Sequence, residues 1–204
     1  MSYWQILLVI LPIFSLIALG VAMRRLAWMT AEADASLLKM VVNFLYPCLI
    51  FESVFDNAAL RVPANLALAP VSGFVLMALG IVAALYIGRL LGLTTGHGLR
   101  TFAFASGINN YGYIPISLMA ALFGPSSLGV LMVHNVGCEA AVWTVGILVL
   151  SGLSLKDGWR KIFNAPVIAL LLGLAGNLLG LGGCLPGFVR EFIHQCAVCA
   201  IPLG

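Results

Sequence analysis

The sequence predicts an all-α integral membrane protein, and three observations support this fold class. The 204 residues are 62% hydrophobic and only 8% charged, with a mean hydropathy of +1.11, whereas a soluble domain needs far more charge on its surface. Apolar stretches of about 20 residues, the length of a helix that crosses a bilayer, recur along the chain. One of them, residues 99–124, carries glycine, asparagine and proline at its centre, which predicts a helix broken inside the membrane.

The first apolar stretch, residues 1–23, is expected to be a retained helix with its N-terminus outside the cell. A secretory signal carries its basic residues before the apolar run, whereas here Arg24 and Arg25 follow it. If the later spans alternate in direction from this start, most basic residues lie on the cytoplasmic side, in agreement with the positive-inside rule. We therefore predict a multi-pass protein of the inner (plasma) membrane. The basic residues then on the cytoplasmic side are Arg24, Arg25, Lys39, Arg89, Arg100, Lys156, Arg160 and Lys161, and those outside are Arg61 and Arg190.

The second span, residues 37–55, follows a polar linker in which Asp34 is a candidate N-cap. Lys39 lies near the cytoplasmic end and is expected to snorkel to the interface. Asn43 lies four residues after Lys39 and four before Pro47, so the three share one helix face. Asn43 either makes a helix–helix hydrogen bond or belongs, with Pro47, to a substrate-binding site, and the sequence leaves both interpretations open.

The third span, residues 66–91, is expected to be a scaffold helix. It is apolar throughout, and Gly73, Gly80 and Gly88 recur along it. Small residues let helix backbones approach closely in a membrane, so these glycines are predicted packing positions.

The stretch 99–124 is long enough to cross the membrane, since 25 residue steps at ~1.5 Å give roughly 37 Å against a hydrocarbon core of about 30 Å. Its centre contains Gly107, Asn109, Asn110, Gly112 and Pro115. We expect two half-helices, over 99–107 and 115–123, with an unwound segment between them near the midplane. Backbone groups freed there cannot face lipid, so they line a cavity or bind a ligand. The alternative is a proline-kinked helix with a structural role.

The fifth span, residues 128–151, holds an acidic residue at depth. Glu139 comes 11 residues after Leu128, which places it ~16 Å into the bilayer, close to the midplane. At 100° per residue, His134, Asn135 and Glu139 fall within an arc of about 140° that must face the bundle interior. An unpaired charge there costs several kcal/mol. We therefore expect Glu139 to be protonated and hydrogen-bonded to the His134–Asn135 face or to the second span. The three residues are candidates for proton coupling, and a structural hydrogen bond is the alternative.

The last two apolar stretches are expected to begin a second block, with spans from about residue 164 to 180 and from about 187 onward. Pro47 and Pro202 lie at matching places in the two blocks, 27 and 26 residues after a glycine. Blocks separated by an odd number of spans insert with opposite topology, as in transporters with inverted repeats. We therefore predict a first five-helix repeat, residues 1–155, and a cytoplasmic loop with two helices of a truncated second repeat, residues 156–204.

Four segments carry a resemblance to known proteins: VVNFLYPCLIFESV, ASGINNYGYIPISLMAALFG, LGVLMVHNVGCEAAVWTVGIL and KIFNAPVIALLLGLAGNLL. The most specific element is Asn-Asn-x-Gly-x-x-Pro at residues 109–115. Over nearly the whole chain, these segments resemble the bacterial branch of the auxin efflux carrier (PIN-like) family.

The resemblance implies ten helices in two inverted five-helix repeats, each with a broken fourth helix, and the two breaks cross at the centre. It also implies elevator-like movement and substrates that are small organic anions such as carboxylates. Asn109, Asn110, Gly112 and Pro115 match the first crossover, and Tyr113 lies in the same element. The second crossover is absent from these 204 residues. We therefore expect a fragment of a ten-helix carrier, or a half-carrier completed by a partner, with a homodimer as one form.

Together these features predict a secondary active transporter, or permease, that binds a small organic anion at the broken helix. The second half-helix offers free amides and the positive end of its dipole, and Asn109 and Asn110 offer side-chain donors. Glu139 would repel the anion unless protonated, which would couple the anion to a proton. The lipid bilayer is the other expected partner. No nucleic acid or cofactor is expected. Cys196-x-x-Cys199 has the spacing of a metal or redox site but lacks a second cluster, so no metal is expected either.

Two other classes of protein stay open. An intramembrane enzyme could use His134 and Glu139 as acid and base, but the sequence has neither a His-Glu-x-x-His motif nor a serine elbow. We therefore do not expect an enzyme. A structural or assembly half-subunit is the second alternative.

Overall fold

The structure, a computed structural model, describes residues 3–146, 148–149 and 164–204, and the regular elements in these ranges are all helical. The predicted all-α class is therefore confirmed. The helices are α1 (Tyr3–Arg25), α2 (Ala31–Met40), α3 (Tyr46–Phe55), α4 (Pro63–Leu90), α5 (Leu99–Gly107), α6 (Tyr113–Phe123), α7 (Ser127–Ala141), α10 (Ala165–Leu178) and α11 (Gly187–Leu203). Two π-helical turns, Val41–Leu45 and Val142–Gly146, and two 3₁₀ turns, Ala58–Arg61 and Leu181–Gly183, complete the set.

Within the described residues, four helices are long and apolar enough to cross a membrane: Ile6–Arg25, Ala31–Phe55, Pro63–Leu90 and Ser127–Gly146. The apolar helices α6 and α10 are shorter. Four of the seven predicted spans are therefore present as long helices, and the fourth predicted span is divided between α5 and α6. The predicted boundary between the repeats, at residues 155 and 156, lies outside the described residues.

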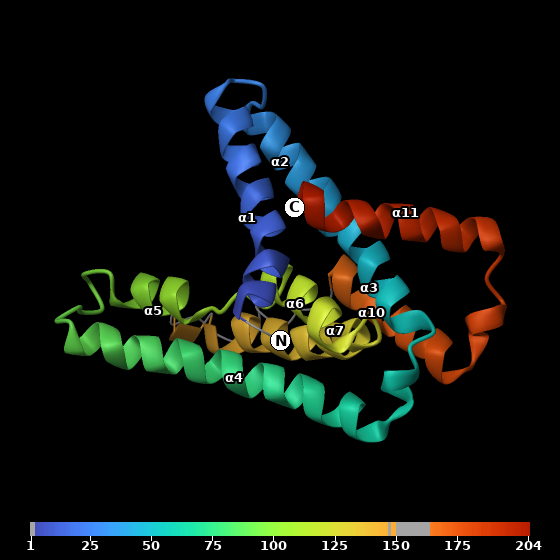
Figure 1. Cartoon of the computed structure of the whole chain (residues 1–204). Helices are drawn as coiled ribbons and strands as arrows, with labels where there is room; N and C mark the ends of the chain where they lie inside the picture. The colour runs from blue at the N-terminus through green and yellow to red at the C-terminus, as the bar shows by residue number, and fades with distance from the viewer. Residues whose placement is uncertain (1–2, 147, 150–163) are drawn as a thin grey trace.

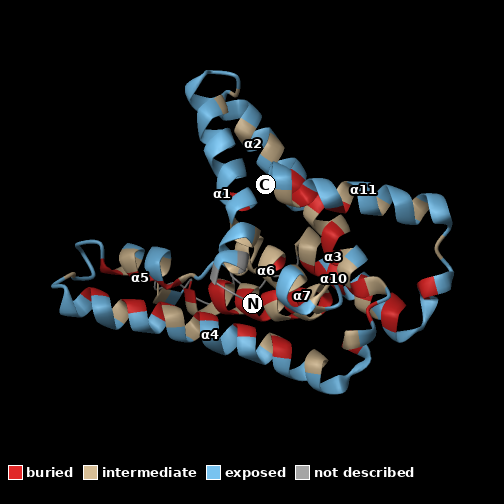
Figure 2. Ribbon diagram, viewed as in Figure 1, coloured by how far each residue is buried: buried red, intermediate tan, exposed pale blue. Residues whose placement is uncertain are grey.

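The helices pack in two groups (Figure 1). In one group, α4 lies along both α5 and α7, and in the other α3 lies along both α10 and α11. The α1–α2 hairpin projects away from α4, and α1 contacts α6 near its own N-terminus. Burial follows this division, because buried residues gather on α3, α4, α7 and α10, whereas α1 is exposed along nearly its whole length (Figure 2).

Glycines bring the backbones of α4 and α7 into contact. A Cβ built on Gly73 would fall on the backbone of His134, and one built on Gly137 would fall on the backbone of Pro70. Further along α4, a Cβ on Gly80 would lie 2.5 Å from the carbonyl oxygen of Gly107 at the end of α5. The predicted packing role of the α4 glycines is therefore confirmed, and the partner helices contribute glycines of their own.

The second long helix, Ala31–Phe55, continues through its proline without a break. Residues Val41–Leu45 form a π-helical turn directly before α3, and Pro47 is the second residue of α3. Because proline has no N–H and its ring clashes with the carbonyl four residues back, a wider turn before it relieves the crowding.

The predicted N-cap of α2 is wrong by one turn. Thr30 is the N-cap, and its side-chain oxygen accepts a hydrogen bond from the amide of Ala33 at 3.2 Å. Asp34 forms an ion pair of 2.9 Å with Arg24. A threonine hydroxyl is a favourable N-cap, and the ion pair of Asp34 with Arg24 links α2 to the end of α1.

Asn177 of α10 ties this helix to the end of α3. Its side chain is 2% exposed, and its amide nitrogen donates to the carbonyl oxygens of Val54 at 2.8 Å and Asn57 at 2.9 Å. Asn177→Leu removes both hydrogen bonds, so we expect it to lower the free energy of unfolding by about 2 kcal/mol. Thermal unfolding in detergent measures this, with Gln195→Leu at an exposed amide of α11 as the control. Equal midpoints for the two variants would contradict the assigned role of Asn177.

Candidate functional site

The predicted break in the fourth span is confirmed. Helix α5 ends at Gly107 and α6 begins at Tyr113, so residues 108–112, here called the unwound segment, separate two half-helices. The end of α5 agrees with the prediction, whereas α6 starts two residues earlier than the predicted Pro115. A proline in the first turn of a helix costs no hydrogen bond, because its missing N–H would have no partner inside the helix there.

A cavity of about 490 Å³ lies against the unwound segment, and we call it the central cavity. Helices α3, α6, α7 and α10 contribute to its wall together with the unwound segment. Its lining residues are Val42, Tyr46, Ile50, Ile108, Asn109, Asn110, Tyr111, Gly112, Tyr113, Met132, Asn135, Val136, Glu139, Asn164, Pro166, Val167 and Leu170. The structure therefore brings six predicted site residues to one cavity: Asn109, Asn110, Gly112, Tyr113, Asn135 and Glu139.

The N-terminus of α6 opens onto the central cavity, since Gly112 and Tyr113 line it. The side-chain oxygen of Asn110 accepts a hydrogen bond from the amide of Gly112 at 3.2 Å, and the first intrahelical bond runs from Ile116 to Gly112 at 3.0 Å. The amides of Tyr113 and Ile114 therefore have no acceptor within the helix. Free amides and the positive end of a helix dipole make this position favourable for an anion.

Glu139 is held by two donors that the sequence did not indicate. The Tyr111 hydroxyl donates to Oε1 at 2.7 Å, and the indole Nε1 of Trp143 donates to Oε2 at 2.8 Å. The prediction that Glu139 bonds to the His134–Asn135 face or to the second span is therefore wrong. Trp143 is four residues further along the chain, inside the π-helical turn that follows α7, and Tyr111 lies in the unwound segment. The sequence did contain a signal for Tyr111, because it is a polar aromatic residue inside the predicted break.

His134 lies on a different side of α7 from Glu139. Its Nδ1 is 3.1 Å from the Ser72 hydroxyl of α4, and it does not line the central cavity. The predicted polar arc spanned about 140°, and the two edges of so wide an arc meet different neighbours. Asn135 is 8% exposed and lines the cavity, and its side-chain oxygen has no hydrogen-bond partner among the described residues.

The remaining predicted site residues lie outside the cavity wall. Asn43 is exposed, and its amide nitrogen donates to the carbonyl oxygen of Lys39 in its own helix at 2.8 Å. Pro47 and Pro115 shape the backbone near the cavity but do not line it. Tyr46, directly before Pro47, does line the cavity, and its ring lies 6.1 Å from that of Tyr113.

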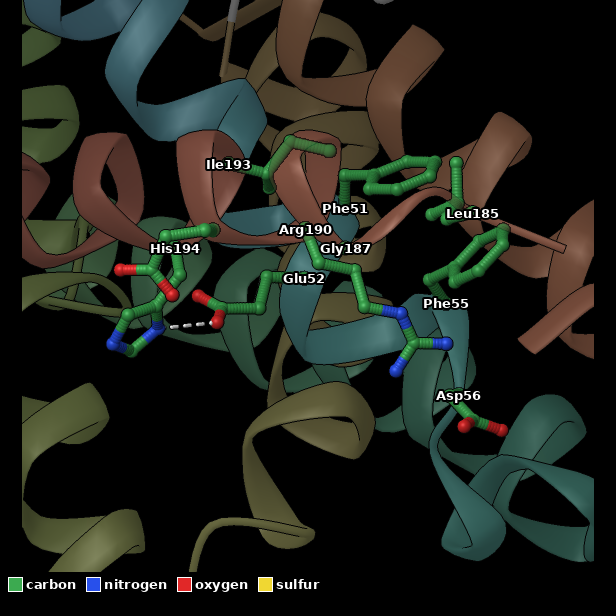
Figure 3. Close-up of a pocket in the computed structure, with 10 residues that line it drawn as sticks. Phe51, Glu52, Phe55, Asp56, Leu185, Gly187, Arg190, Ile193 and His194 are labelled. Carbon is green, nitrogen blue, oxygen red and sulfur yellow. Dashed lines mark hydrogen bonds and ion pairs between the residues drawn. The ribbon is translucent and has the colours of Figure 1, made fainter. Parts of the chain in front are cut away.

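A smaller pocket of about 230 Å³ lies between α3 and α11 (Figure 3). Nδ1 of His194 and Oε1 of Glu52 are 2.7 Å apart there, and both side chains are substantially exposed. The guanidinium group of Arg190 points past Phe55 toward Asp56. An ion pair this exposed contributes little to stability.

The charge of the central cavity is unusual for an anion site. Among the residues that the structure places in its wall, Glu139 is the only acidic one, and none is lysine, arginine or histidine. Donors for an anion there are the free amides of α6 and the side-chain amides of Asn109 and Asn110. The carboxyl group of Glu139 therefore sets the electrostatic balance of the cavity.

Comparison with known proteins agrees with this architecture. A family model described as membrane transport protein matches residues 5–156. The chain is also 29% identical over 195 residues to an uncharacterized transporter of Methanothermobacter thermautotrophicus (strain Delta H). That match covers 93% of this chain and 63% of the relative, so the chain spans less than two thirds of the relative's length. No solved structure matches the chain. With three quarters of its length matched by the family model, and with the broken apolar helix in place, this multi-pass membrane protein belongs to the membrane transport protein family, the auxin efflux carrier family.

Proposed function

We propose that this protein is a secondary active transporter that moves small organic anions, carboxylates in particular, across the plasma membrane. The observation that carries the proposal is the central cavity at the start of α6, where Asn109 and Asn110 meet a helix N-terminus. The carboxylate of the substrate binds the free amides of Tyr113 and Ile114 and the side-chain amides of the two asparagines. The apolar remainder of the wall accepts the body of the substrate.

Proton coupling follows from the charge of the cavity. A substrate carboxylate beside an ionised Glu139 would place two negative charges in one small cavity without a basic side chain among its described lining residues. Like charges at this separation and in a medium of low polarity repel strongly. The substrate therefore binds when Glu139 is protonated, and proton and anion cross together as in a symporter.

Transport requires the cavity to open to each side of the membrane in turn. The α4–α5–α7 group and the α3–α10–α11 group are the two parts that move against each other, with the unwound segment between them. The N-terminus lies outside the cell in this proposal. Residues corresponding to the remainder of the longer relative complete the transport path.

Asn109→Ala is expected to raise the KM for the transported anion by roughly ten- to a hundredfold, because a hydrogen bond to a charged group is worth about 1.5–3 kcal/mol. Asn110→Ala should do the same and also loosen the start of α6, since its side chain bonds to Gly112. Uptake and counterflow of radiolabelled succinate and indole-3-acetate in proteoliposomes measure the effect, with protein-free liposomes correcting for passive entry.

The matched control is Gln195→Ala, which removes an exposed amide on α11 whose nitrogen donates to Glu191 in the same helix at 2.6 Å. It should leave the KM unchanged. If both asparagine variants keep the wild-type KM, the anion binds elsewhere. If the wild type exchanges neither probe, the proposed substrate class is wrong.

A further inference from the structure

We propose that the Tyr111 hydroxyl group is a switch that supplies a hydrogen bond to the substrate when Glu139 is protonated and withdraws it when Glu139 is ionised. The inference rests on the proposed function, since it names the group through which proton and carboxylate act on each other. It assigns Tyr111 a role in binding that a purely electrostatic account of Glu139 does not contain.

Glu139 is held from two different parts of the fold. Tyr111 Oη donates to Oε1 from the unwound segment, 28 residues away in sequence, at 2.7 Å. Trp143 Nε1 donates to Oε2 from the same helix, four residues away, at 2.8 Å. Tyr111 and Glu139 both line the central cavity, so their hydrogen bond lies at the wall where substrate is proposed to bind.

The chemistry of the two donors decides what protonation does. An ionised carboxylate only accepts hydrogen bonds, and it accepts both of these without rearrangement. A protonated carboxyl group has a donor of its own. The indole N–H can only donate, so Oε2 stays an acceptor, whereas the phenol oxygen can donate or accept. The proton therefore resides on Oε1, and the hydrogen bond to Tyr111 reverses its direction.

Reversal frees the hydroxyl hydrogen of Tyr111 for the cavity. A proton from cavity water adds to Oε1 of Glu139, the acid O–H then donates to Tyr111 Oη, and the Tyr111 O–H turns toward the substrate carboxylate. On release the proton returns to water and Tyr111 again donates to Glu139. Loss of the negative charge and gain of a donor thus occur together, and both favour binding of an anion.

No other charge that the structure places in the wall competes with this exchange. Tyr46 of α3 and Tyr113 of α6 are the other titratable residues that line the cavity. Cys138, next to Glu139 on α7, directs its Sγ to the carbonyl oxygen of Gly73 on α4 at 3.5 Å. Within the described residues, α10 contributes apolar side chains, a proline and Asn164 to the wall. Changes of pH therefore reach the site through the carboxyl group of Glu139.

The test measures equilibrium binding of radiolabelled succinate and benzoate to the detergent-solubilised protein from mildly acidic to mildly alkaline pH. Binding is preferred to uptake because benzoic acid crosses bilayers unaided. Wild-type affinity should rise as pH falls. Tyr111→Phe should bind about tenfold more weakly than wild type at the acidic end, where one hydrogen bond to a charged group is lost, and equally at the alkaline end.

Two further variants isolate the switch. Glu139→Gln imitates the protonated acid, since its amide can donate to Tyr111 while its oxygen accepts from Trp143, and it should bind tightly at every pH. Adding Tyr111→Phe to Glu139→Gln should lower the affinity of Glu139→Gln about tenfold, because the hydroxyl donor is lost while the negative charge stays absent. Tyr46→Phe is the matched control, because it deletes a hydroxyl from the same cavity and should retain the wild-type dependence on pH.

Infrared difference spectra of the ligand-free protein test the Glu139–Tyr111 hydrogen bond without a substrate. The carbonyl stretch of protonated Glu139 is identified by its absence in Glu139→Gln, and Tyr111→Phe should shift it because the acceptor of its hydrogen bond is lost. An unshifted band, or a Tyr111→Phe variant whose affinity follows pH as the wild type does, overturns the switch. A shifted band in a protein that binds neither probe supports the switch and overturns the anion substrate.

Discussion

Gly137→Ala is expected to remove most of the folded protein and to lower the free energy of unfolding of the remainder by about 3 kcal/mol or more. A Cβ at this position would fall on the carbonyl oxygen of Pro70 and would lie 2.7 Å from its carbonyl carbon and 2.8 Å from the amide nitrogen of Phe74. These atoms belong to the backbone of α4, so no side-chain rotation can make room. The two helices must separate, and overpacking of this kind costs about 1–3 kcal/mol even where side chains can yield.

The monodisperse fraction after solubilisation and the midpoint of thermal unfolding measure this effect. Gly20→Ala is the control, because a Cβ there meets nothing within 4 Å and α1 gains helix propensity. It should match or exceed the wild-type midpoint. A Gly137→Ala protein that melts with the wild type would show that α4 and α7 are further apart than the structure places them.

Glu139→Leu is expected to abolish transport, whereas Glu139→Gln is expected to retain substrate exchange and lose accumulation driven by pH. Leucine removes the acceptor of the hydrogen bonds from the half-buried Tyr111 hydroxyl and Trp143 indole N–H, and each lost bond to a carboxyl group costs about 1–3 kcal/mol. Glutamine preserves both contacts but cannot carry a proton. A symport of one proton with one anion sustains, at zero membrane potential, about a tenfold ratio of anion concentrations per unit of pH difference, and this ratio should fall to one in Glu139→Gln.

Paired assays on the same proteoliposomes separate these outcomes: counterflow of radiolabelled succinate at equal pH, and net uptake under an imposed pH difference. Exchange without accumulation identifies Glu139 as the proton carrier. Wild-type behaviour of Glu139→Gln in both assays would make the residue structural and would place any proton coupling elsewhere in the protein.

Local sequence signals predicted the break in the fourth span and the glycine packing of α4. The end of α5 at Gly107 and the break after it follow from glycine, asparagine and proline within a few residues, and these residue types act on the backbone next to them. The close packing of α4 was likewise predictable from its spaced glycines. In both cases the physical cause lies within one or two turns of the residue concerned.

Contacts between distant segments could not be predicted in the same way. The partners of Glu139 depend on how the unwound segment crosses α7, and His134 turns to α4 because the helix spreads its polar residues over too wide an arc. Thr30 is the N-cap of α2, whereas Asp34 pairs with Arg24 of α1, and this pairing depends on how the two helices pack. The gathering of Asn109, Asn110 and Glu139 at one cavity is thus a result of tertiary packing, and the roles of these residues in binding stay predictions.

The glycine contacts along α4 also determine where the molecule is stiff and where it is compliant. Where backbones touch, few side-chain rotations remain to absorb a displacement, so α4, α5 and α7 respond to force as one plate. The unwound segment, which follows α5, and the π-helical turn Val142–Gly146, which follows α7, are joined to that plate without the regular hydrogen-bond ladder of an α-helix. Elastic deformation is therefore concentrated in these few residues, which include Tyr111 and Trp143, the two hydrogen-bond donors to Glu139.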